Sequence, residues 1–332
     1  MATFKEIRGQ TIKKYTTNPT NPLEGQMWYN NTTGTLKGVV LSTAAWASGG
    51  SLNNPTRGSN SSFGSTPAGV MVGGTTPTGP ITADTELYDG TAWTANPNAC
   101  PFSVGYGTGG GPQTAGIICS GQSPPGSGTA TAKFDGSAWT SAPSRSASTQ
   151  SSMGVGTQTS FIQVGGEFPP SWTGLTSVET FNGASWSTEP NSYPAGLTKG
   201  FAGGTAAAAV VGGGTPNPTG ASNTWDGSSW TAAPVLSVGG ERYNGAYAGT
   251  STDAFAIGGY DTPSGGFTDV DVFDGTTWAT TTSTTTGTSS GAAAGQTGGP
   301  GGVIKMGGAY GTETTCEEFS GAVAVTKTIT TS

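Results

Sequence analysis

The stretch Phe161-Ile162-Gln163-Val164-Gly165-Gly166, followed by Glu179-Thr180-Phe181-Asn182-Gly183-Ala184-Ser185-Trp186, decides the fold. Its first part is an apolar run that ends in two glycines, which is typical of a buried strand. In its second part an Asn-Gly pair separates two aromatic residues and predicts a tight hairpin turn between two further strands. The same pattern recurs throughout the chain, so these residues define one copy of a repeat.

The repeat is most visible in its tryptophans, which are 44 to 48 residues apart: Trp46, Trp93, Trp139, Trp186, Trp230 and Trp278. Five residues before each Trp from the second onward stands an aromatic that begins an aromatic–Asp/Asn–Gly triplet: Tyr88-Asp89-Gly90, Phe134-Asp135-Gly136, Phe181-Asn182-Gly183, Trp225-Asp226-Gly227 and Phe273-Asp274-Gly275. A sixth triplet, Phe319-Ser320-Gly321, has no Trp after it. A period of this length indicates one supersecondary unit copied around an array.

Each repeat contains four strand signals. A short glycine-containing segment comes first, then the apolar run, then the strand that ends in the aromatic, then the Trp strand. The glycine-containing segments lie around Gly64, Gly109, Gly156, Gly203, Gly249 and Gly295, and they suit the crowded innermost strand of a ring. Four-stranded units of about 46 residues are typical of a β-propeller blade.

These motifs resemble the kelch repeat, which is the repeat of the propeller in galactose oxidase-type proteins. Two finer features agree with the resemblance over roughly residues 40–325. An acidic residue stands two before the aromatic at Glu86, Glu179, Asp271 and Glu317, and a proline stands four after the Trp at Pro97, Pro143, Pro190 and Pro234. Ala132 and Asn223 replace the acid, Ser120 replaces a glycine and Thr282 replaces the proline. We expect the four carboxylates to accept hydrogen bonds within or between blades.

The repeat counts predict an all-β, six-bladed kelch-like propeller. The first Trp has no complete blade before it, and the last aromatic strand has no Trp strand after it. The strand around Trp46 is therefore expected to pair with the strand that ends at Phe319 and close the ring. The alternative is seven blades, with three strands from residues 26–48 and a fourth from Val323–Thr330. We place the domain boundary after residue 38, with an N-terminal arm and hairpin at 1–38 and the propeller at 39–332.

Composition excludes several classes of function. The chain contains no histidine, which removes the Ser-His-Asp triad and the histidine ligands of galactose oxidase-type copper sites. The net charge is −7, and basic residues form no cluster that suits nucleic acid. No apolar stretch approaches the length of a membrane-spanning helix. We therefore expect no enzymatic activity, no cofactor, no metal, no nucleic-acid partner and no membrane insertion.

The N-terminal segment resembles structural proteins of tailed phages, especially marine ones. The resemblance lies in Leu23–Lys37, which reads Leu-Glu-Gly-Gln-Met-Trp-Tyr-Asn-Asn-Thr-Thr-Gly-Thr-Leu-Lys. It implies a virion protein that is attached through its arm, for which Lys5, Arg8, Lys13 and Lys14 are the candidate contacts. We expect the arm to be extended and to contact other virion proteins, and we expect the chain to be a homo-oligomer.

The candidate binding site lies on the long loops. In a four-stranded blade, the loops after the second and fourth strands open on one face, and such variable loops on a rigid ring commonly bind partners. Aromatic and basic residues of these loops suit sugars or protein hot spots: Phe168, Trp172, Tyr193, Arg242, Tyr243, Tyr260 and Phe267. The sequence thus predicts a phage tail fibre, spike or decoration protein that binds host surface glycan or protein. The alternative is a cellular kelch-type protein- or carbohydrate-binding protein without a virion.

Overall fold

The computed structural model describes residues 12–20, 23–54, 58, 61–75, 80–119, 121–123, 126–216, 220–237, 242, 244–259, 266–295, 302–308, 314–322 and 324–329. Within these residues the protein is all-β, with seven four-stranded sheets, one two-stranded sheet and no helix. The chain divides into two compact units. Unit 1 comprises Met1–Ala45 and Gly321–Ser332, and unit 2 comprises Trp46–Ser320.

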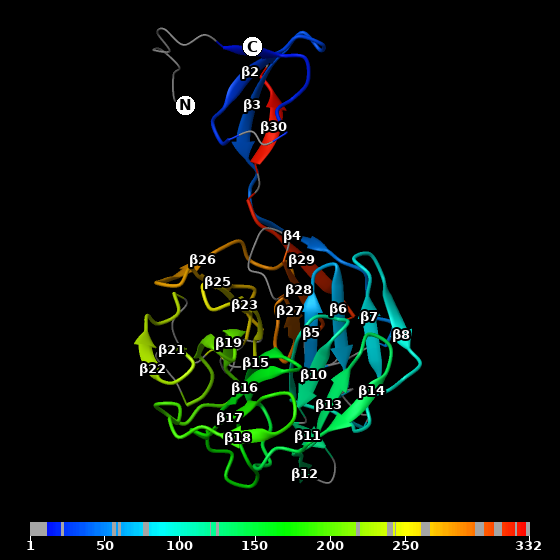
Figure 1. Ribbon diagram of the computed structural model, residues 1–332, viewed down its shortest axis with the longest axis vertical. Coiled ribbons are helices and arrows are strands. Elements are labelled where there is room, and N and C mark those ends of the chain that lie inside the picture. The colour runs from blue at the N-terminus through cyan, green and yellow to red at the C-terminus, as the bar shows by residue number, and fades with distance from the viewer. Residues whose placement is uncertain are drawn as a thin grey trace. The chain divides into compact units, whose positions relative to one another are not determined.

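Unit 2 contains six four-stranded sheets, numbered here in chain order (Figure 1). Sheet 1 consists of β5 (Ser61–Ser65), β6 (Ala68–Val72), β7 (Thr85–Tyr88) and β8 (Trp93–Asn96), and sheet 2 of β9 (Thr108–Gly110), β10 (Gly116–Cys119), β13 (Thr131–Phe134) and β14 (Trp139–Ala142). Sheet 3 consists of β15 (Met153–Thr157), β16 (Ser160–Val164), β17 (Val178–Phe181) and β18 (Trp186–Thr188), and sheet 4 of β19 (Phe201–Thr205), β20 (Ala208–Gly212), β21 (Ser222–Trp225) and β22 (Trp230–Ala233). Sheet 5 consists of β23 (Ala246–Thr250), β24 (Asp253–Ile257), β25 (Val270–Phe273) and β26 (Trp278–Thr280), and sheet 6 of β27 (Ala292–Ala294), β28 (Val303–Met306), β29 (Cys316–Ser320) and β4 (Ala45–Ser48). The two-stranded sheet, β11 (Gln122–Ser123) with β12 (Gly126–Ser127), lies within the loop that follows β10.

The first strands of the six sheets contact one another in cyclic order. Strand β5 contacts β9, β9 contacts β15, and the series continues through β19, β23 and β27 back to β5. Glycines allow this approach, because a Cβ on Gly110 would lie only 2.6 Å from the carbonyl oxygen of Gly156 on the neighbouring sheet. The arrangement is consistent with a β-propeller.

The expected pairing of the Trp46 strand is confirmed. Strand β4 is the fourth strand of sheet 6 beside β29, and the Trp46 and Phe319 rings are 5.2 Å apart. The number of four-stranded sheets is nevertheless seven instead of six, because unit 1 has a sheet of its own. That sheet consists of β1 (Lys13–Tyr15), β2 (Met27–Asn30), β3 (Thr35–Leu41) and β30 (Ala324–Thr328). The division between the units thus follows Ala45, and the C-terminal strand belongs to unit 1.

The hydrophobic core of unit 2 lies between neighbouring sheets. One cluster joins Phe63 and Val72 of sheet 1 to Ile118 and Phe134 of sheet 2, and comparable clusters join later pairs. The six repeat aromatics are all buried: Tyr88, Phe134, Phe181, Trp225, Phe273 and Phe319. The repeat tryptophans differ in their burial. Trp46, Trp93 and Trp278 are buried, whereas Trp139, Trp186 and Trp230 are half-buried, although all six lie on the fourth strands of their sheets.

The turns between third and fourth strands are the tight hairpins that the sequence predicts. Each Asp or Asn side-chain oxygen accepts hydrogen bonds from the two backbone amides that complete its turn. For Asp89 these are the amides of Thr91 and Ala92, both at 2.8 Å. The following Gly90 has a φ of 93°, a conformation that favours glycine. A hydrogen bond from the Thr91 hydroxyl at 2.7 Å, together with these two backbone hydrogen bonds, lowers the pKa of Asp89 below its usual range.

Candidate functional site

The carboxylates of the repeat hold the junctions between sheets. Glu86 on β7 accepts hydrogen bonds from the backbone amides of Asn53 (2.8 Å) and Asn54 (3.1 Å), in the segment that enters sheet 1. The other three carboxylates bind the corresponding segments of their own sheets: Glu179 binds Ser146, Asp271 binds Arg242, and Glu317 binds Thr285 and Thr286. All four side chains are buried. The expectation that they accept hydrogen bonds in the fold is confirmed.

Where the acid is replaced, the entering segment changes with it. In sheet 4 the Nδ2 of Asn223 donates to the hydroxyl of Tyr193 at 2.9 Å, and that hydroxyl donates to the carbonyl of Val211. In sheet 2 Ala132 belongs to an apolar cluster that includes Cys100 of the entering segment. The position two residues before the repeat aromatic therefore contacts the entering segment in three ways: through a carboxylate in four sheets, through an amide in sheet 4 and through an apolar side chain in sheet 2.

The long loops and the entering segments meet on one face of unit 2, which we call the loop face. Isolated antiparallel bridges join the loop after a second strand to the segment that enters the same sheet. They pair Gly58 with Thr75, Gly105 with Gln122, Gln150 with Glu167, and Thr198 with Thr215. Two further bridges, Leu175 with Leu197 and Phe267 with Thr288, join such a loop to the segment that enters the next sheet. This pairing agrees with the expectation that both sets of loops lie on the same face.

The loop between β16 and β17 exposes two aromatic side chains. Phe168 is 48% exposed and Trp172 is 55% exposed. The Trp172 amide donates to the carbonyl of Phe168 at 3.3 Å, and the Ser171 hydroxyl donates to the same carbonyl at 3.0 Å. Trp172 adopts a φ of 51°, which is uncommon for a bulky residue. The loop thus presents both rings to solvent from a hydrogen-bonded turn.

Glu167 anchors the start of this loop. Its carboxylate is buried and accepts a hydrogen bond from Lys199 Nζ at 2.9 Å, and Ser151 Oγ lies 3.3 Å away. The Lys199 side chain remains about a quarter exposed. The ion pair connects the aromatic loop to residues at the centre of the loop face.

Five of these central residues have left-handed backbone conformations at equivalent repeat positions, and we call them the mouth residues: Tyr106, Ser151, Lys199, Asn244 and Ser290. Each amide from Ser151 onward donates to the carbonyl of the mouth residue before it, at 2.6 to 2.9 Å. They form a continuous hydrogen-bonded arc that runs through five consecutive sheets.

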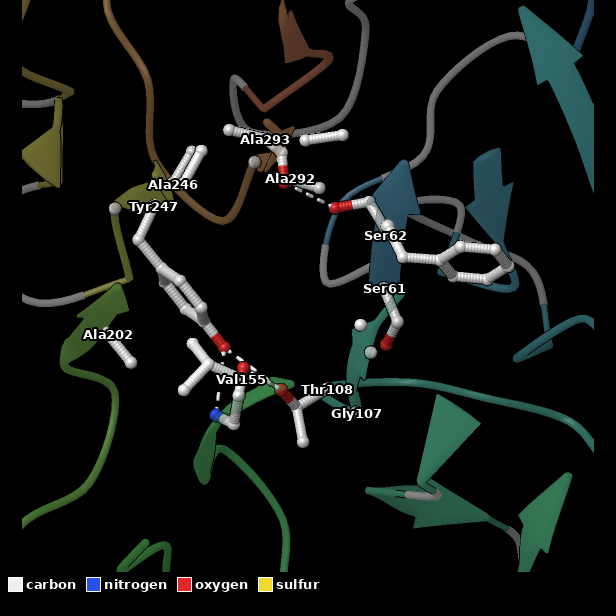
Figure 2. Close-up of a pocket in the computed structure, with 18 of the residues that line it drawn as sticks. Ser61, Ser62, Gly107, Thr108, Val155, Ala202, Ala246, Tyr247, Ala292 and Ala293 are labelled. Carbon is white, nitrogen blue, oxygen red and sulfur yellow. Dashed lines mark hydrogen bonds between the residues drawn. The ribbon is translucent and has the colours of Figure 1, made fainter. Parts of the chain in front are cut away.

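A cavity of roughly 130 Å³ is lined by the mouth residues and by residues of the first strands of all six sheets, some of which Figure 2 shows. Its walls consist mostly of glycine, alanine and serine. The largest side chain labelled there, Tyr247, points across the cavity, and its hydroxyl hydrogen bonds with Thr108 Oγ1 (3.0 Å) and the Gly154 amide (3.4 Å). Burial raises the pKa of Tyr247. The lining offers hydroxyls, backbone groups and the Lys199 ammonium to a polar ligand.

The other candidate binding residues differ in their exposure. Phe267 is partly buried, and Tyr243 and Tyr260 lie outside the described residues. Tyr193 and Arg242, two of the candidate binding residues, are buried. Tyr193 occupies the junction with Asn223. Arg242 donates to Asp271 at 3.0 Å and to carbonyls of sheet 5, so its charge is neutralised inside the protein.

Of the candidate attachment residues, Lys13 and Lys14 lie on β1 and are exposed, while Lys5 and Arg8 lie outside the described residues. The described part of the arm folds onto its own hairpin. Strand β1 pairs in parallel with β2, and Asn18 Oδ1 accepts from Asn30 Nδ2 at 3.0 Å. The arm is thus part of unit 1, a role that the sequence did not predict.

Sequence reasoning missed the mouth residues. A signal was present: they recur at intervals of 45 to 48 residues, and a glycine follows Tyr106, Lys199, Asn244 and Ser290 directly. Among the described residues, no group of three potential metal-ligating side chains comes together. The described residues likewise include no helix with the length and apolar character needed to cross a membrane.

Comparison of the chain with protein-family models and with curated proteins finds no match.

Proposed function

We propose that this protein is a structural component of a phage virion, a tail fibre, spike or decoration protein, in which unit 2 is a six-bladed kelch-like propeller. Six repeats, six sheets and the cyclic contacts of their first strands support this blade count. The sheet of unit 1 is then a separate attachment module, and the kelch resemblance accounts for the Gly-Gly strands and the buried acids.

The virion assignment rests on the resemblance of Leu23–Lys37 to phage structural proteins. In the fold this segment includes β2 and the first residues of β3, and these two strands form an antiparallel hairpin with Tyr29 opposite Leu36. The hairpin is the centre of unit 1. An attachment segment would need such a self-contained fold, because it must keep its shape independently of the ring that it carries.

The binding role of unit 2 rests on one observation, the exposure of Phe168 and Trp172 on a loop anchored by the ion pair of the buried Glu167 carboxylate with Lys199. Exposed apolar side chains that gather in one place mark interaction sites more often than scattered ones do. Phe168 and Trp172 lie on one short loop, and rings on rigid loops bind sugars and proteins with little loss of entropy. The Lys199 ammonium nearby adds a donor for hydroxyl or carboxylate groups. We propose host surface glycan or protein as the ligand of this loop.

Two measurements test the proposal. Mass spectrometry of gradient-purified particles should find the chain in stoichiometric amounts. A fluorescently labelled chain should then bind cells of the host strain, and the variant Phe168→Ser/Trp172→Ser should reduce that binding at least tenfold. Val235→Ser is the matched control, because Val235 is equally exposed (54%) but belongs to another segment. Cell binding by a chain that is absent from particles would favour the cellular alternative instead.

A further inference from the structure

The sheet of unit 1 has one covered and one open face. Register places Trp28 opposite Lys37 and Asn30 opposite Thr35, so these side chains share a face with Val39. Trp28, Asn30 and Val39 are buried there. Residues of the arm cover them, since Asn18 Oδ1 accepts from the Trp28 indole at 3.3 Å and from the Asn30 amide.

The opposite face, which we call the open face, is apolar and uncovered. Tyr29 lies opposite Leu36, and Val40 follows on the same side of β3. Ile329 lies over Gly38, because a Cβ on Gly38 would be 3.0 Å from its Cδ1. Tyr29, Val40 and Ile329 are 36%, 46% and 38% exposed. Four strands with one apolar face need a partner to bury it.

Lysines flank the open face. Lys14 pairs with Tyr29 across β1 and β2, and Lys327 pairs with Gly38 across β30 and β3, so both project on this side. Both are exposed. The four strands contain four lysines and no acidic residue. The apolar centre of the open face therefore has a rim of positive charge.

Charge is segregated between the two units. The segments of unit 1 contain six Lys/Arg and two Glu, a formal charge of +4, while unit 2 contains six Lys/Arg and seventeen Asp/Glu, a charge of −11. These values account for the net charge of −7. An acidic protein thus carries its positive charge on the small unit with the uncovered apolar face.

We propose that the open face is the attachment surface, and that it binds an acidic surface with an apolar centre on another structural protein of the particle. The inference rests on the proposed virion function and names the surface and the chemistry of its partner. The open face of a second copy of this chain is not a suitable partner for this surface. Two open faces in contact would bring Lys14 and Lys327 of both copies together, and no carboxylate of the four strands could neutralise them.

The first test identifies what covers the open face. The photo-crosslinking residue p-benzoylphenylalanine replaces Val40 in chains assembled into particles, and in a control replaces Thr33, an exposed residue of the β2–β3 turn. Irradiation should join the Val40 position to a different structural protein, through a peptide rich in Asp and Glu, and the Thr33 position far less. Crosslinking to a second copy of this chain, or equal yields at both positions, overturns the proposal.

The second test separates charge from fold. Lys14→Glu/Lys327→Glu should lower incorporation into particles at least tenfold, and Lys14→Gln/Lys327→Gln should lower it less. The free variants should keep the wild-type melting temperature and the host-cell binding of unit 2. If wild-type chains enter particles and the Glu variant enters equally well, the inference fails while the virion function stands. If wild-type chains are absent from particles, both fail.

Discussion

Units 1 and 2 are built from the same element, a four-stranded sheet, but they differ in what covers the faces of those sheets. In unit 2 each sheet packs between two others, and the repeat aromatics fill the space between them. In unit 1 a single sheet has one face covered by its own arm and one face open. Among the described residues, unit 1 holds most of the exposed large hydrophobic side chains: Ile12, Leu23, Tyr29, Val40 and Ile329, against Phe168, Trp172 and Val235 in unit 2.

The difference shows how repetition and surface function are related. A repeated sheet in cyclic order buries both of its faces against copies of itself, so its uncovered aromatics are exceptions confined to loops. A single sheet cannot do this and depends on a partner. Changes in the core of unit 2 should therefore affect stability, while changes on the open face should affect assembly.

The largest expected effect is the loss of a repeat aromatic. Phe134 is fully buried and packs against Phe63 and Trp139, with ring centroids at 6.2 and 4.8 Å. Phe134→Ala should lower the free energy of unfolding by about 3–5 kcal/mol. Tyr29→Ala on the open face should lower it by less than about 1 kcal/mol, since Tyr29 is already exposed. Urea titration of both variants measures the two losses of unfolding free energy. Equal losses would contradict the difference that we infer between the core of unit 2 and the open face of unit 1.

The second-largest loss of stability should come from breaking the buried ion pair of sheet 5. Arg242→Met removes the partner of Asp271 at 3.0 Å and leaves a carboxylate uncompensated in the core, which should cost about 3 kcal/mol. Arg242→Met/Asp271→Leu should restore part of this loss, because it removes both charges. Lys14→Met, an exposed lysine of unit 1, is the control and should leave the urea midpoint unchanged.

Acid should destabilise unit 2 through Glu317. Burial alone would raise the pKa of this carboxyl, but hydrogen bonds from Thr285, Thr286 and Lys305 outweigh burial and lower it from 4.5 to about 2. A depressed folded-state pKa contributes stability that is complete above about pH 4.5 and is lost as the pH falls toward 2. Lys305→Met/Glu317→Gln should flatten this part of the pH dependence of the melting temperature. An unchanged slope would contradict the assignment.

Smaller losses of stability are expected when the side-chain acceptors of the indole hydrogen bonds between neighbouring sheets are removed. Trp278 Nε1 is buried and donates to Ser222 Oγ at 3.2 Å, whereas Trp186 Nε1 donates both to Thr131 Oγ1 and to the carbonyl of Pro143. Ser222→Ala should cost about 1–2 kcal/mol, and Thr131→Val about 0.5 kcal/mol, because only the first leaves a buried donor unpaired. Thermal unfolding measures both losses of stability. Equal losses would show that the Pro143 carbonyl does not compensate for the missing Thr131 hydroxyl.

Local patterns predict the repeating parts of the molecule well. Residue types at fixed spacing predict the strands, the tight turns, the closure at Trp46 and the hydrogen-bonding acids, because equivalent residues occupy equivalent packing positions in every repeat. The burial of Tyr193 and Arg242 was missed, because their partners Asn223 and Asp271 lie about 30 residues away in another strand. For Tyr193, the available signal was the replacement of the repeat acid by Asn223, which indicates that a polar side chain of the entering segment contacts this position.

The sheet of unit 1 was harder to predict, because its strands come from opposite ends of the chain. Strand β30 pairs with β3 across almost 300 residues, with Val325 opposite Val40. The seven-blade alternative anticipated this pairing, because it combined strands from residues 26–48 with one from Val323–Thr330. It also placed the Trp46 strand in that sheet, whereas β4 belongs to sheet 6. The fourth strand, β1, came from an arm that was expected to contact only other subunits.

The central claim is that two surfaces of this protein have separate tasks, the open face for attachment and the β16–β17 loop for binding outward. Hydroxyl-radical footprinting with mass spectrometry tests it directly, by comparing the oxidation rates of Tyr29 and Trp172 in the free chain and in purified particles. We predict that assembly lowers the rate of Tyr29 several-fold and leaves that of Trp172 unchanged. Protection of Trp172 with an unchanged rate for Tyr29 would contradict the claim.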